Sequence, residues 1–238
     1  MPWAAEGGGV TAGEEVTKGL SGLSERLAEY AKMGATFTKW RAVIRIGEGI
    51  PTNECLLENA KRLAEYAKKS QEAGLVPMIE PEVLLDGTHT LARSEEVLTK
   101  TLHVTFAEVA KAGVALSCLI LKSSMALPGK DSGKTASPKE IAESTLRAFT
   151  SSVPAEVPGI VFLSGGQTPE EATERLNEIV TQAKEQNAPW RISFSYSRAL
   201  QEPVMKEWSG KPEKVASAQK IFQERVRETS AASEGKFK

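Results

Sequence analysis

The sequence predicts an α/β fold in which strands and helices alternate along the chain. Five short runs rich in β-branched and aromatic residues recur at intervals of about 30 to 45 residues, and helical patterns that end at glycines separate them. Such alternation indicates βαβ units and a parallel sheet. No G-x-G-x-x-G motif opens a helix after a strand, whereas polar residues collect at the C-terminal ends of strands, as they do in barrels. We therefore expect a (β/α)8 TIM barrel, with five of its eight βα units present in this chain.

The individual elements follow from hydrophobic periodicity and from start and stop signals. Two helices begin with capping boxes that place proline at the first helical position, S-P-K-E at residues 137–140 and T-P-E-E at residues 168–171. Residues 1–16 are Gly-rich and aperiodic, so we expect a flexible segment there, followed by one barrel domain over residues 17–238. The expected strands cover residues 37–46, 75–84, 119–125, 159–166 and 191–196. The expected helices cover residues 17–33, 52–73, 94–112, 137–151, 168–186 and 212–229.

The composition excludes several classes of protein. With 238 residues, of which 40% are hydrophobic and 26% charged, the chain can form one large globular domain. A net charge of −1 predicts no nucleic-acid or membrane-surface partner, and no apolar run approaches the roughly 20 residues of a membrane span. Two cysteines and two histidines provide neither a disulfide framework nor a histidine-rich zinc site. The N-terminus has no signal-peptide pattern, so we expect a cytoplasmic protein.

A lysine at the end of an apolar run is the first candidate for chemistry. Lys122 follows Leu119-Ile120-Leu121, which we expect to form a buried strand. An ammonium group in such a place must be paired or have its pKa lowered, and a lysine with a lowered pKa can form a Schiff base with a ketone. The alternative is that Lys122 marks the exit of the strand into solvent, with its aliphatic stem lying on apolar surface.

Two pairs of charged residues lie two positions apart in neighbouring predicted strands. Lys39 and Arg41 share one face of their strand, and Glu80 and Glu82 share one face of theirs, because side chains at i and i+2 point the same way. Inside a barrel these groups would lie close enough to pair with one another or with a charged substrate. They would then form either a buried ion-pair network or part of a site.

A Gly-rich segment, L-S-G-G-Q at residues 163–167, leads from a predicted strand into a helix. Backbone N–H groups in such a turn, next to a helix N-terminus, can cradle a phosphate, although many such turns are only tight connections. Arg198, just after the last strand, could supply a cation for the same phosphate. Together these residues suggest a phosphorylated ketone held beside Lys122, with carboxylates to move protons.

Five motifs occur in order along the chain: F-T-K-W-R at 37–41, I-E-P-E-V-L at 79–84, L-K-S-S-M at 121–125, F-L-S-G-G-Q at 162–167 and F-S-Y-S-R-A-L at 194–200. Together they closely resemble class I fructose-bisphosphate aldolase, the Schiff-base, metal-independent class. The resemblance covers about residues 19 to 238. It implies a lyase of glycolysis that reversibly cleaves fructose 1,6-bisphosphate to dihydroxyacetone phosphate and glyceraldehyde 3-phosphate.

The resemblance also implies a role for each candidate residue. Lys122 would form the Schiff base, and Glu80 would be the main general acid/base. Lys39 would assist proton transfer and orient the substrate, and Glu82 would support the lysines electrostatically. The phosphate nearer the aldehyde half would contact Arg41. The phosphate of the ketone half would be bound by Ser164, Gly165, Gly166 and Arg198, with Ser195 and Tyr196 lining that region.

The chain departs from the family pattern in a few places. Ser197 stands where glycine usually precedes Arg198, and Ser123 stands where proline usually follows Lys122. We expect three family strands ahead of residue 37, and a C-terminal tail with a terminal tyrosine, to be missing. The resemblance implies a homo-oligomer, a tetramer in the family, that acts on a phosphorylated sugar without a cofactor. A second hypothesis is a truncated, catalytically weak remnant that serves as an interaction module or as half of a fragment assembly.

Overall fold

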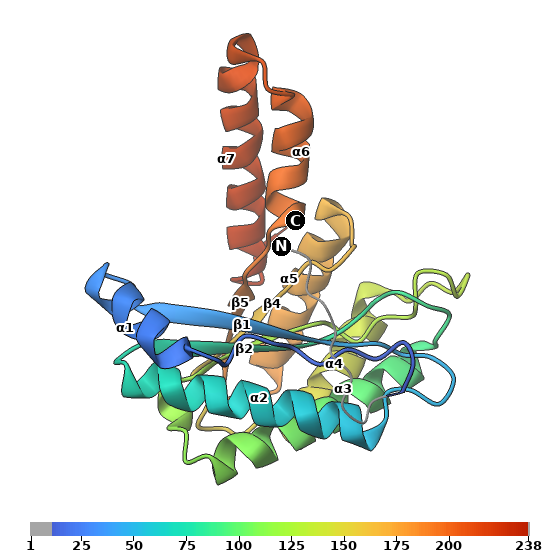
Figure 1. Cartoon of the computed structure of the whole chain (residues 1–238). Helices are drawn as coiled ribbons and strands as arrows, with labels where there is room; N and C mark the ends of the chain where they lie inside the picture. Colours follow the sequence, from blue (N-terminus) through green and yellow to red (C-terminus); the bar gives the residue numbers. More distant parts are fainter. Residues whose placement is uncertain (1–10, 238) are drawn as a thin grey trace.

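Within residues 11–237, which a computed structural model describes, five parallel strands form one sheet in the order of the sequence (Figure 1). Each strand is hydrogen-bonded to the next in parallel register, for example Trp40 opposite Ile79 and Leu121 opposite Ile160. The expected α/β alternation is therefore confirmed. The strands are β1 (Phe37–Ile44), β2 (Val76–Val83), β3 (Ile120–Ser123), β4 (Gly159–Phe162) and β5 (Arg191–Phe194).

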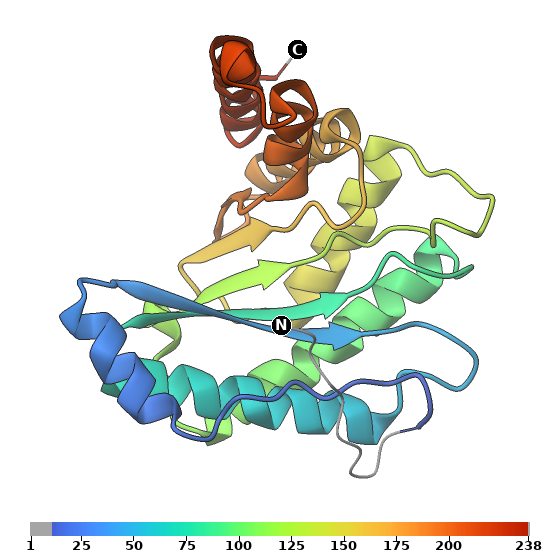
Figure 2. The same cartoon turned by 45° about the horizontal axis from the view of Figure 1, so that its top comes forward.

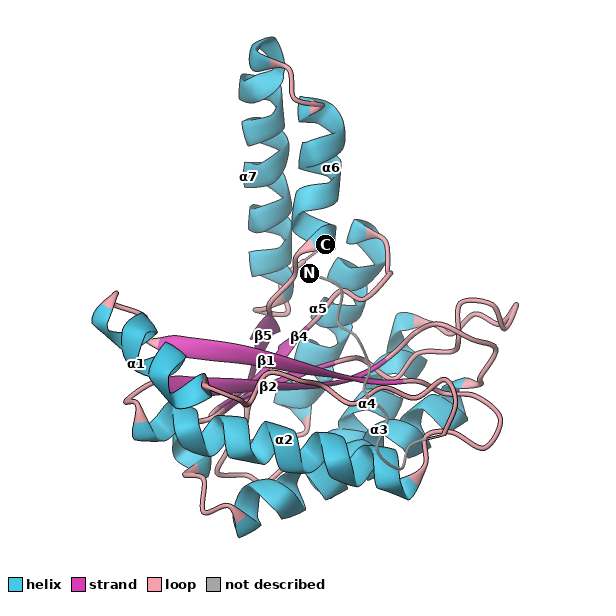
Figure 3. Cartoon of the chain, in the orientation of Figure 1, coloured by secondary structure: helices cyan, strands magenta, loops and turns pink. Residues whose placement is uncertain are grey.

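Helices α2 to α5 pack side by side against one face of the sheet (Figure 3). They connect successive strands, as expected for βαβ units. Short 3₁₀ turns occur at Leu116–Cys118 and Pro212–Lys214. The helices are α1 (Leu23–Lys32), α2 (Asn53–Glu72), α3 (Leu91–Lys111), α4 (Pro138–Ser152), α5 (Pro169–Glu185), α6 (Arg198–Trp208) and α7 (Val215–Ala232).

The layer between the sheet and these helices is the hydrophobic core. Side chains alternate along each strand, so Ile79, Leu121 and Ile160 all point into this layer, and each is 0% exposed. Phe149 of α4 stacks on Phe162 of β4 with 5.7 Å between the ring centroids. Burying one such side chain contributes about 1.5–3 kcal/mol, so this layer supplies the main stabilisation of the fold.

The opposite face of the sheet carries no helix of the described residues (Figure 2). Val43 and Ile120 are partly exposed there, whereas Met78 between their strands is buried. The outermost strands, β1 and β5, each pair with only one described strand. The sheet formed by residues 11–237 is therefore open on one face and along two edges.

Both predicted capping boxes are formed. The side chain of Ser137 accepts from the backbone N–H of Glu140, and the Glu140 carboxylate accepts from the backbone N–H of Ser137. Thr168 and Glu171 make the same reciprocal pair at the start of α5. Each box satisfies two N–H groups that a helix N-terminus would otherwise leave without an acceptor.

The first helix begins later than the sequence pattern predicted, at Leu23 rather than at Thr17. Gly19 and Gly22 have φ angles of 127° and 61°, which no α-helix accommodates. The backbone N–H of Thr17 donates instead to the Asn59 side chain on α2, at 3.0 Å. Tertiary contacts to α2 therefore override the local helical pattern.

The Gly-rich segment 1–16 also differs from the expectation of a flexible end. Residues 1–10 lie outside the described residues, but Glu14 is buried against the start of α2. Its carboxylate accepts from the backbone N–H of Thr52 at 2.6 Å and from the Thr52 hydroxyl at 2.8 Å. Residues 11–16 are therefore held against the domain by these bonds.

Helix α6 was not predicted, because Pro203 lies within it and its first residue has no side-chain cap. It packs against α7, and the two helices form a hairpin that projects away from the sheet (Figure 1). The last helix begins at Val215 and ends at Ala232, so its start and its end each lie three residues later than expected. Among the described helices, none has the length and apolar character needed to cross a membrane.

Candidate active site

A carboxylate lies between two lysines on the uncovered face of the sheet. Oε1 of Glu80 on β2 is 3.2 Å from Nζ of Lys122 on β3, and Oε2 is 3.0 Å from Nζ of Lys39 on β1. The parallel register brings these three side chains together from separate parts of the chain. The Lys39 contact lacks the alignment of a hydrogen bond, so it is an ion pair.

Burial distinguishes the two lysines. The Lys122 side chain is 12% exposed and the Lys39 side chain 41%, while Glu80 is 3% exposed. Lys122 therefore does not mark an exit into solvent, which was the alternative left open by the sequence. It is an almost buried amine paired with an almost buried carboxylate.

A second charged pair lies beside the first, nearer the C-terminal ends of the strands. Nε of Arg41 donates a hydrogen bond to Oε2 of Glu82, and this bond raises the pKa of Arg41. The Arg41 side chain is 44% exposed and the Glu82 side chain 7%. Lys39 with Glu80 and Arg41 with Glu82 thus form two neighbouring ion pairs, and Arg41 remains accessible to an anion from the open face.

The Gly-rich turn connects β4 to α5. Gly165 and Gly166 have positive φ angles, which favour glycine, and a Cβ on Gly165 would lie 2.5 Å from Cδ1 of Leu163, so the Leu163 side chain would have to move to admit another residue. The backbone N–H groups of Gly165 and Gly166 donate to no described residue. Two N–H donors next to a helix N-terminus are a suitable binding place for an anion.

Two further predicted ligands of the same phosphate lie near this turn: Ser164 directly before it, and Arg198 at the start of α6. Ser164 is buried, and its hydroxyl accepts a long hydrogen bond of 3.4 Å from the backbone N–H of Ala199. Arg198, the first residue of α6, is exposed and makes no hydrogen bond or ion pair with a described residue. Its guanidinium is therefore available to an anion at the turn.

The two residues expected to line this region differ from each other. Ser195 is partly exposed, and its backbone N–H donates to the carbonyl of Phe162 at 2.8 Å. Tyr196 is buried, which raises the pKa of its phenol, and its hydroxyl donates to the carbonyl of Ala172 at 2.8 Å. Tyr196 therefore fastens the end of β5 to α5, and its hydroxyl is already engaged there rather than directed at a phosphate.

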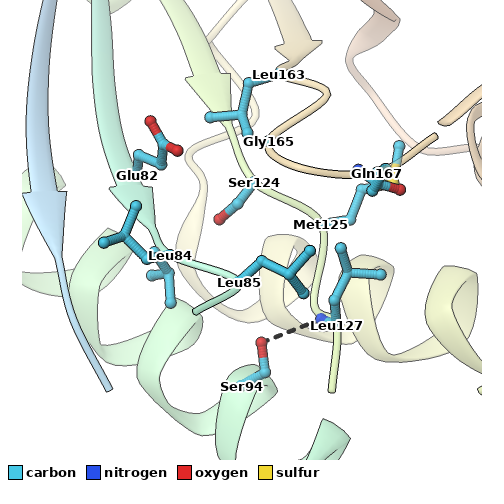
Figure 4. Close-up of a pocket in the computed structure, with 11 residues that line it drawn as sticks. Glu82, Leu84, Leu85, Ser94, Ser124, Met125, Leu127, Leu163, Gly165 and Gln167 are labelled. Carbon is cyan, nitrogen blue, oxygen red and sulfur yellow. Dashed lines mark hydrogen bonds between the residues drawn. The ribbon is translucent and has the colours of Figure 1, made fainter. Parts of the chain in front are cut away.

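A small pocket lies at the C-terminal ends of β2, β3 and β4 (Figure 4). Ser124, which lines it, is 4% exposed, and its hydroxyl oxygen has no described hydrogen-bond partner. Sequence reasoning did not single out Ser124, although its position two residues after Lys122, on the same face, was a signal that could have found it. The other lining residues are Glu82, Val83, Leu84, Leu85, Ser94, Met125, Leu127, Leu163, Gly165 and Gln167.

The histidines lie outside this constellation. Nε2 of His103 is hydrogen-bonded to the carbonyl of Ser151 at 2.8 Å. His89 is buried, which lowers its pKa, and its two ring nitrogens have no described hydrogen-bond partner. Among residues 11–237, no group of three or more His, Cys, Asp or Glu side chains is placed to hold a metal ion.

The arrangement as a whole suits a substrate with an anionic group at each end. An amine and a carboxylate 3.2 Å apart can exchange a proton, at the distance expected for a general acid or base. Arg41 on β1 lies to one side of this pair, and the turn after β4 lies to the other. The site therefore combines a nucleophile, a proton-transfer group and two places for negative charge.

Known proteins are similar to this chain in sequence and in fold. The family model described as fructose-bisphosphate aldolase class-I matches residues 9–238. A probable fructose-bisphosphate aldolase class 1 of Xanthomonas campestris is 49% identical over 227 residues, which are 95% of this chain and 67% of that protein. The cytoplasmic isozyme of spinach (Spinacia oleracea) is 46% identical, over 95% of this chain and 63% of that protein.

A solved structure agrees with these sequence matches. It is fructose-bisphosphate aldolase from Plasmodium falciparum, in a complex with TRAP and a small-molecule inhibitor. The two chains are 39% identical and superpose with a TM-score of 0.94, over 99% of this chain and 67% of that one. The present chain thus spans 67% of the length of its bacterial relative. The chain belongs to the class I fructose-bisphosphate aldolase family.

Proposed function

We propose that the chain performs the aldol cleavage of fructose 1,6-bisphosphate through a Schiff base on Lys122. The observation that carries this proposal is the almost buried Lys122 amine, next to the C-terminal end of β3 and 3.2 Å from the Glu80 carboxylate of β2. Catalytic groups of barrel enzymes lie at that end of the strands. Family membership supports an aldolase over the alternative of a catalytically weak interaction module.

The proposed chemistry begins at Nζ of Lys122, which attacks the ketone carbon once Glu80 has accepted its proton. Loss of water from the resulting carbinolamine gives an iminium ion, which acts as an electron sink. A base then removes the proton of the C4 hydroxyl, the C3–C4 bond breaks, and its electron pair forms an enamine on the ketone half. Protonation of that enamine and addition of water release dihydroxyacetone phosphate and regenerate the amine.

The neighbouring residues support these steps. Glu80 is the main proton-transfer group, and Lys39, 3.0 Å from its Oε2, assists it and orients the substrate. Glu82 lies beside this cluster and keeps Arg41 in place for the phosphate on the aldehyde half. The phosphate of the ketone half is held by the backbone N–H groups of Gly165 and Gly166, by Ser164 and by the Arg198 guanidinium.

The test is chemical trapping. Incubation with dihydroxyacetone phosphate and borohydride should leave a secondary amine on Lys122, located by peptide mapping, and Lys122→Met should leave none. Lys39→Met is the matched control, because it removes the other amine beside Glu80 and should still allow trapping on Lys122. An adduct mapped to Lys39 in the unchanged chain would contradict the assignment. EDTA should not reduce trapping or turnover, and a loss restored by zinc would favour the metal-dependent class.

The proposal extends to the location, the oligomeric state and the partners of the protein. We infer a cytoplasmic homo-oligomer that acts on a phosphorylated sugar and has no nucleic-acid or membrane partner. Light scattering of the purified chain should give a mass above 25.7 kDa.

A further inference from the structure

A buried arginine on α7 contacts the first turn of α5. Only 10% of the Arg225 side chain is exposed. Its Nη2 donates to the backbone carbonyl of Pro169 at 2.7 Å and to the hydroxyl of Thr173 at 2.8 Å. The Thr173 hydroxyl in turn donates to the same Pro169 carbonyl at 2.7 Å. One guanidinium group is thus hydrogen-bonded to two oxygen atoms of a single helical turn.

The other side of the guanidinium is held by acidic residues. Nη1 of Arg225 donates to Glu228 of α7 at 2.6 Å, and Glu170 of α5 lies 3.9 Å away. Glu170 is largely exposed, so Glu228 is the stronger partner. The carbonyl of Arg225 accepts from the Thr229 hydroxyl at 2.8 Å. Arg225 is therefore fixed on its own helix as well as on α5.

This is not the simplest way to join two helices. Apolar side chains of similar volume often replace a buried ion pair without loss of stability. A cation beside a helix N-terminus is moreover opposed by the helix dipole, which is positive there. The carboxylates of Glu170 and Glu171 in the first turn of α5 relieve part of that opposition, and an anion bound at the start of α5 would relieve more of it.

The first turn of α5 is directly connected to the Gly-rich turn. Pro169 is the first residue of α5, Thr168 is its cap, and only Gln167 separates that cap from Gly166. Four hydrogen bonds from outside α5 hold this region. Arg225 donates to Pro169 and to Thr173, the Tyr196 hydroxyl donates to Ala172, and the Ala199 N–H donates to Ser164. Any shift of Pro169 is therefore passed to the N–H groups of Gly165 and Gly166, which donate to no described residue.

We propose that Arg225 is a positioning residue that holds the N-terminal turn of α5, and with it the Gly165–Gly166 turn, in the geometry that binds a phosphate group. This rests on the proposed function, because it takes the Gly-rich turn to be the phosphate site of the ketone half. Arg225 acts through Pro169 and Thr173 and does not touch the substrate. The projecting hairpin, which contains α7, would thus help to hold the phosphate site in shape.

The experiment measures inorganic phosphate binding and catalysis in the full chain. Titration calorimetry should show phosphate binding weakened roughly tenfold by Arg225→Met, within the 10²-fold that a misplacement of about 1 Å can cost. KM for fructose 1,6-bisphosphate should rise by a similar factor, while borohydride trapping on Lys122 at saturating dihydroxyacetone phosphate is retained. Phosphate binding should stay weakened in Arg225→Lys, because an ammonium group lacks the planar guanidinium with which Arg225 contacts both Pro169 and Thr173.

A matched control separates positioning from stability. Arg147 of α4, whose side chain is 59% exposed, donates two hydrogen bonds to Glu95 of α3, at 2.9 and 2.8 Å, and makes no hydrogen bond or ion pair to α5. Arg147→Met should leave phosphate affinity and KM unchanged. Thr173→Val removes one of the two α5 acceptors without removing a charge, and it provides a second test should Arg225→Met fail to fold. It should weaken phosphate binding in the same direction as Arg225→Met.

The outcomes separate the two proposals. Phosphate affinity and KM that are unchanged in Arg225→Met or Thr173→Val, or fully restored in Arg225→Lys, would overturn the positioning role. A chain that is trapped on Lys122 but does not bind inorganic phosphate would overturn the phosphate assignment of the Gly-rich turn, and the inference with it. A chain that is not trapped at all, yet shows the expected phosphate pattern, would overturn only the proposed Schiff-base function.

Discussion

The two faces of the sheet differ in what covers them and in what they carry. On the helix-covered face, Ile79 and Leu121 are fully buried and belong to the hydrophobic core. On the other face, their chain neighbours Glu80 and Lys122 form an ion pair. Successive residues of the same two strands thus serve stability on one side and chemistry on the other, because side chains alternate along a strand.

This difference explains how a costly charged cluster is tolerated. Glu80 is almost buried, and an isolated carboxylate in that place would be strongly unfavourable. Two ammonium groups compensate it, and the apolar layer behind the sheet supplies the stability that the cluster itself does not. The comparison predicts that changes on the open face alter activity and that changes on the covered face alter folding.

The largest effect concerns the open face as a whole. The five described strands do not close into a barrel, and β1 and β5 each have one edge whose N–H and C=O groups pair with no described strand. At about 25 cal/mol per Å², wet apolar surface on this face can consume much of a typical stability of about 5–15 kcal/mol. We expect the chain expressed by itself to self-associate through this face, and to turn over faster when it is combined with a segment equivalent to the unmatched third of its bacterial relative.

Light scattering and a cleavage assay, each with and without that segment, check this expectation. The segment should reduce self-association and raise turnover together. A monodisperse and fully active chain in its absence would show that the open face needs no cover.

The second prediction concerns the carboxylate between the two lysines. Glu80→Gln should reduce turnover about 10²–10⁴-fold, the usual contribution of a general acid or base, while binding of dihydroxyacetone phosphate is largely kept. Glu82→Gln is the matched variant on the same strand face, and it should cost less because Glu82 pairs with Arg41 rather than with Lys122. Steady-state kinetics of both variants give the comparison, and a larger loss for Glu82→Gln would exchange the two roles.

The third prediction tests the covered face. Phe149 is fully buried, stacks on Phe162 and meets the edge of Trp190 at 6.4 Å. Phe149→Ala should lower the free energy of unfolding by about 3–5 kcal/mol, while Phe149→Leu, which fills more of the space, should cost less. Urea denaturation measures both losses. Turnover per folded molecule should be unchanged, and a kinetic defect in folded Phe149→Leu would show that the two faces are coupled.

The smallest effect is expected at the helix cap that holds the N-terminal segment. The Thr52 hydroxyl accepts from the backbone N–H of Cys55 and donates to Glu14, so Thr52→Ala should cost about 1–2 kcal/mol. Thr90→Ala is the matched control, because the Thr90 hydroxyl caps α3 by accepting from the backbone N–H of Arg93 and makes no bond to a described acidic residue. Its loss should be the smaller one in urea denaturation.

This cap also predicts a pH dependence. Burial opposes ionisation of Glu14, but hydrogen bonds from Thr52 and from Thr11 outweigh it and lower the pKa of Glu14 below its usual 4.5. A lowered carboxyl pKa stabilises the fold above the unfolded-state value and loses that effect as the pH falls through the folded-state value. The difference in unfolding free energy between the unchanged chain and Thr52→Ala should therefore shrink below about pH 4.5. A difference that is constant down to pH 3 would rule out a contribution from Glu14.

Local interactions were predictable because both partners lie within one turn of the chain. The capping boxes of Ser137 with Glu140 and of Thr168 with Glu171 are examples, since each needs residues only three positions apart. The alternation of strands and helices was likewise predictable, because the hydrophobic periodicity of each segment indicates its secondary structure. Pro203 marks the limit of this method, because a proline argues against a helix locally while α7 supports α6 from a distance.

The sequence by itself determined the order of the strands' apolar and charged residues, and so the choice of Lys122, Glu80 and Lys39 as candidates. Only the tertiary structure decided which of them meet. The register between β1, β2 and β3 sets which of their residues lie side by side, and it depends on residues far apart in the sequence. The tertiary structure also engaged the Tyr196 hydroxyl with Ala172, and it brought Arg225 to Pro169 across 56 residues of sequence. Such contacts depend on the packing of whole helices, which no local pattern encodes.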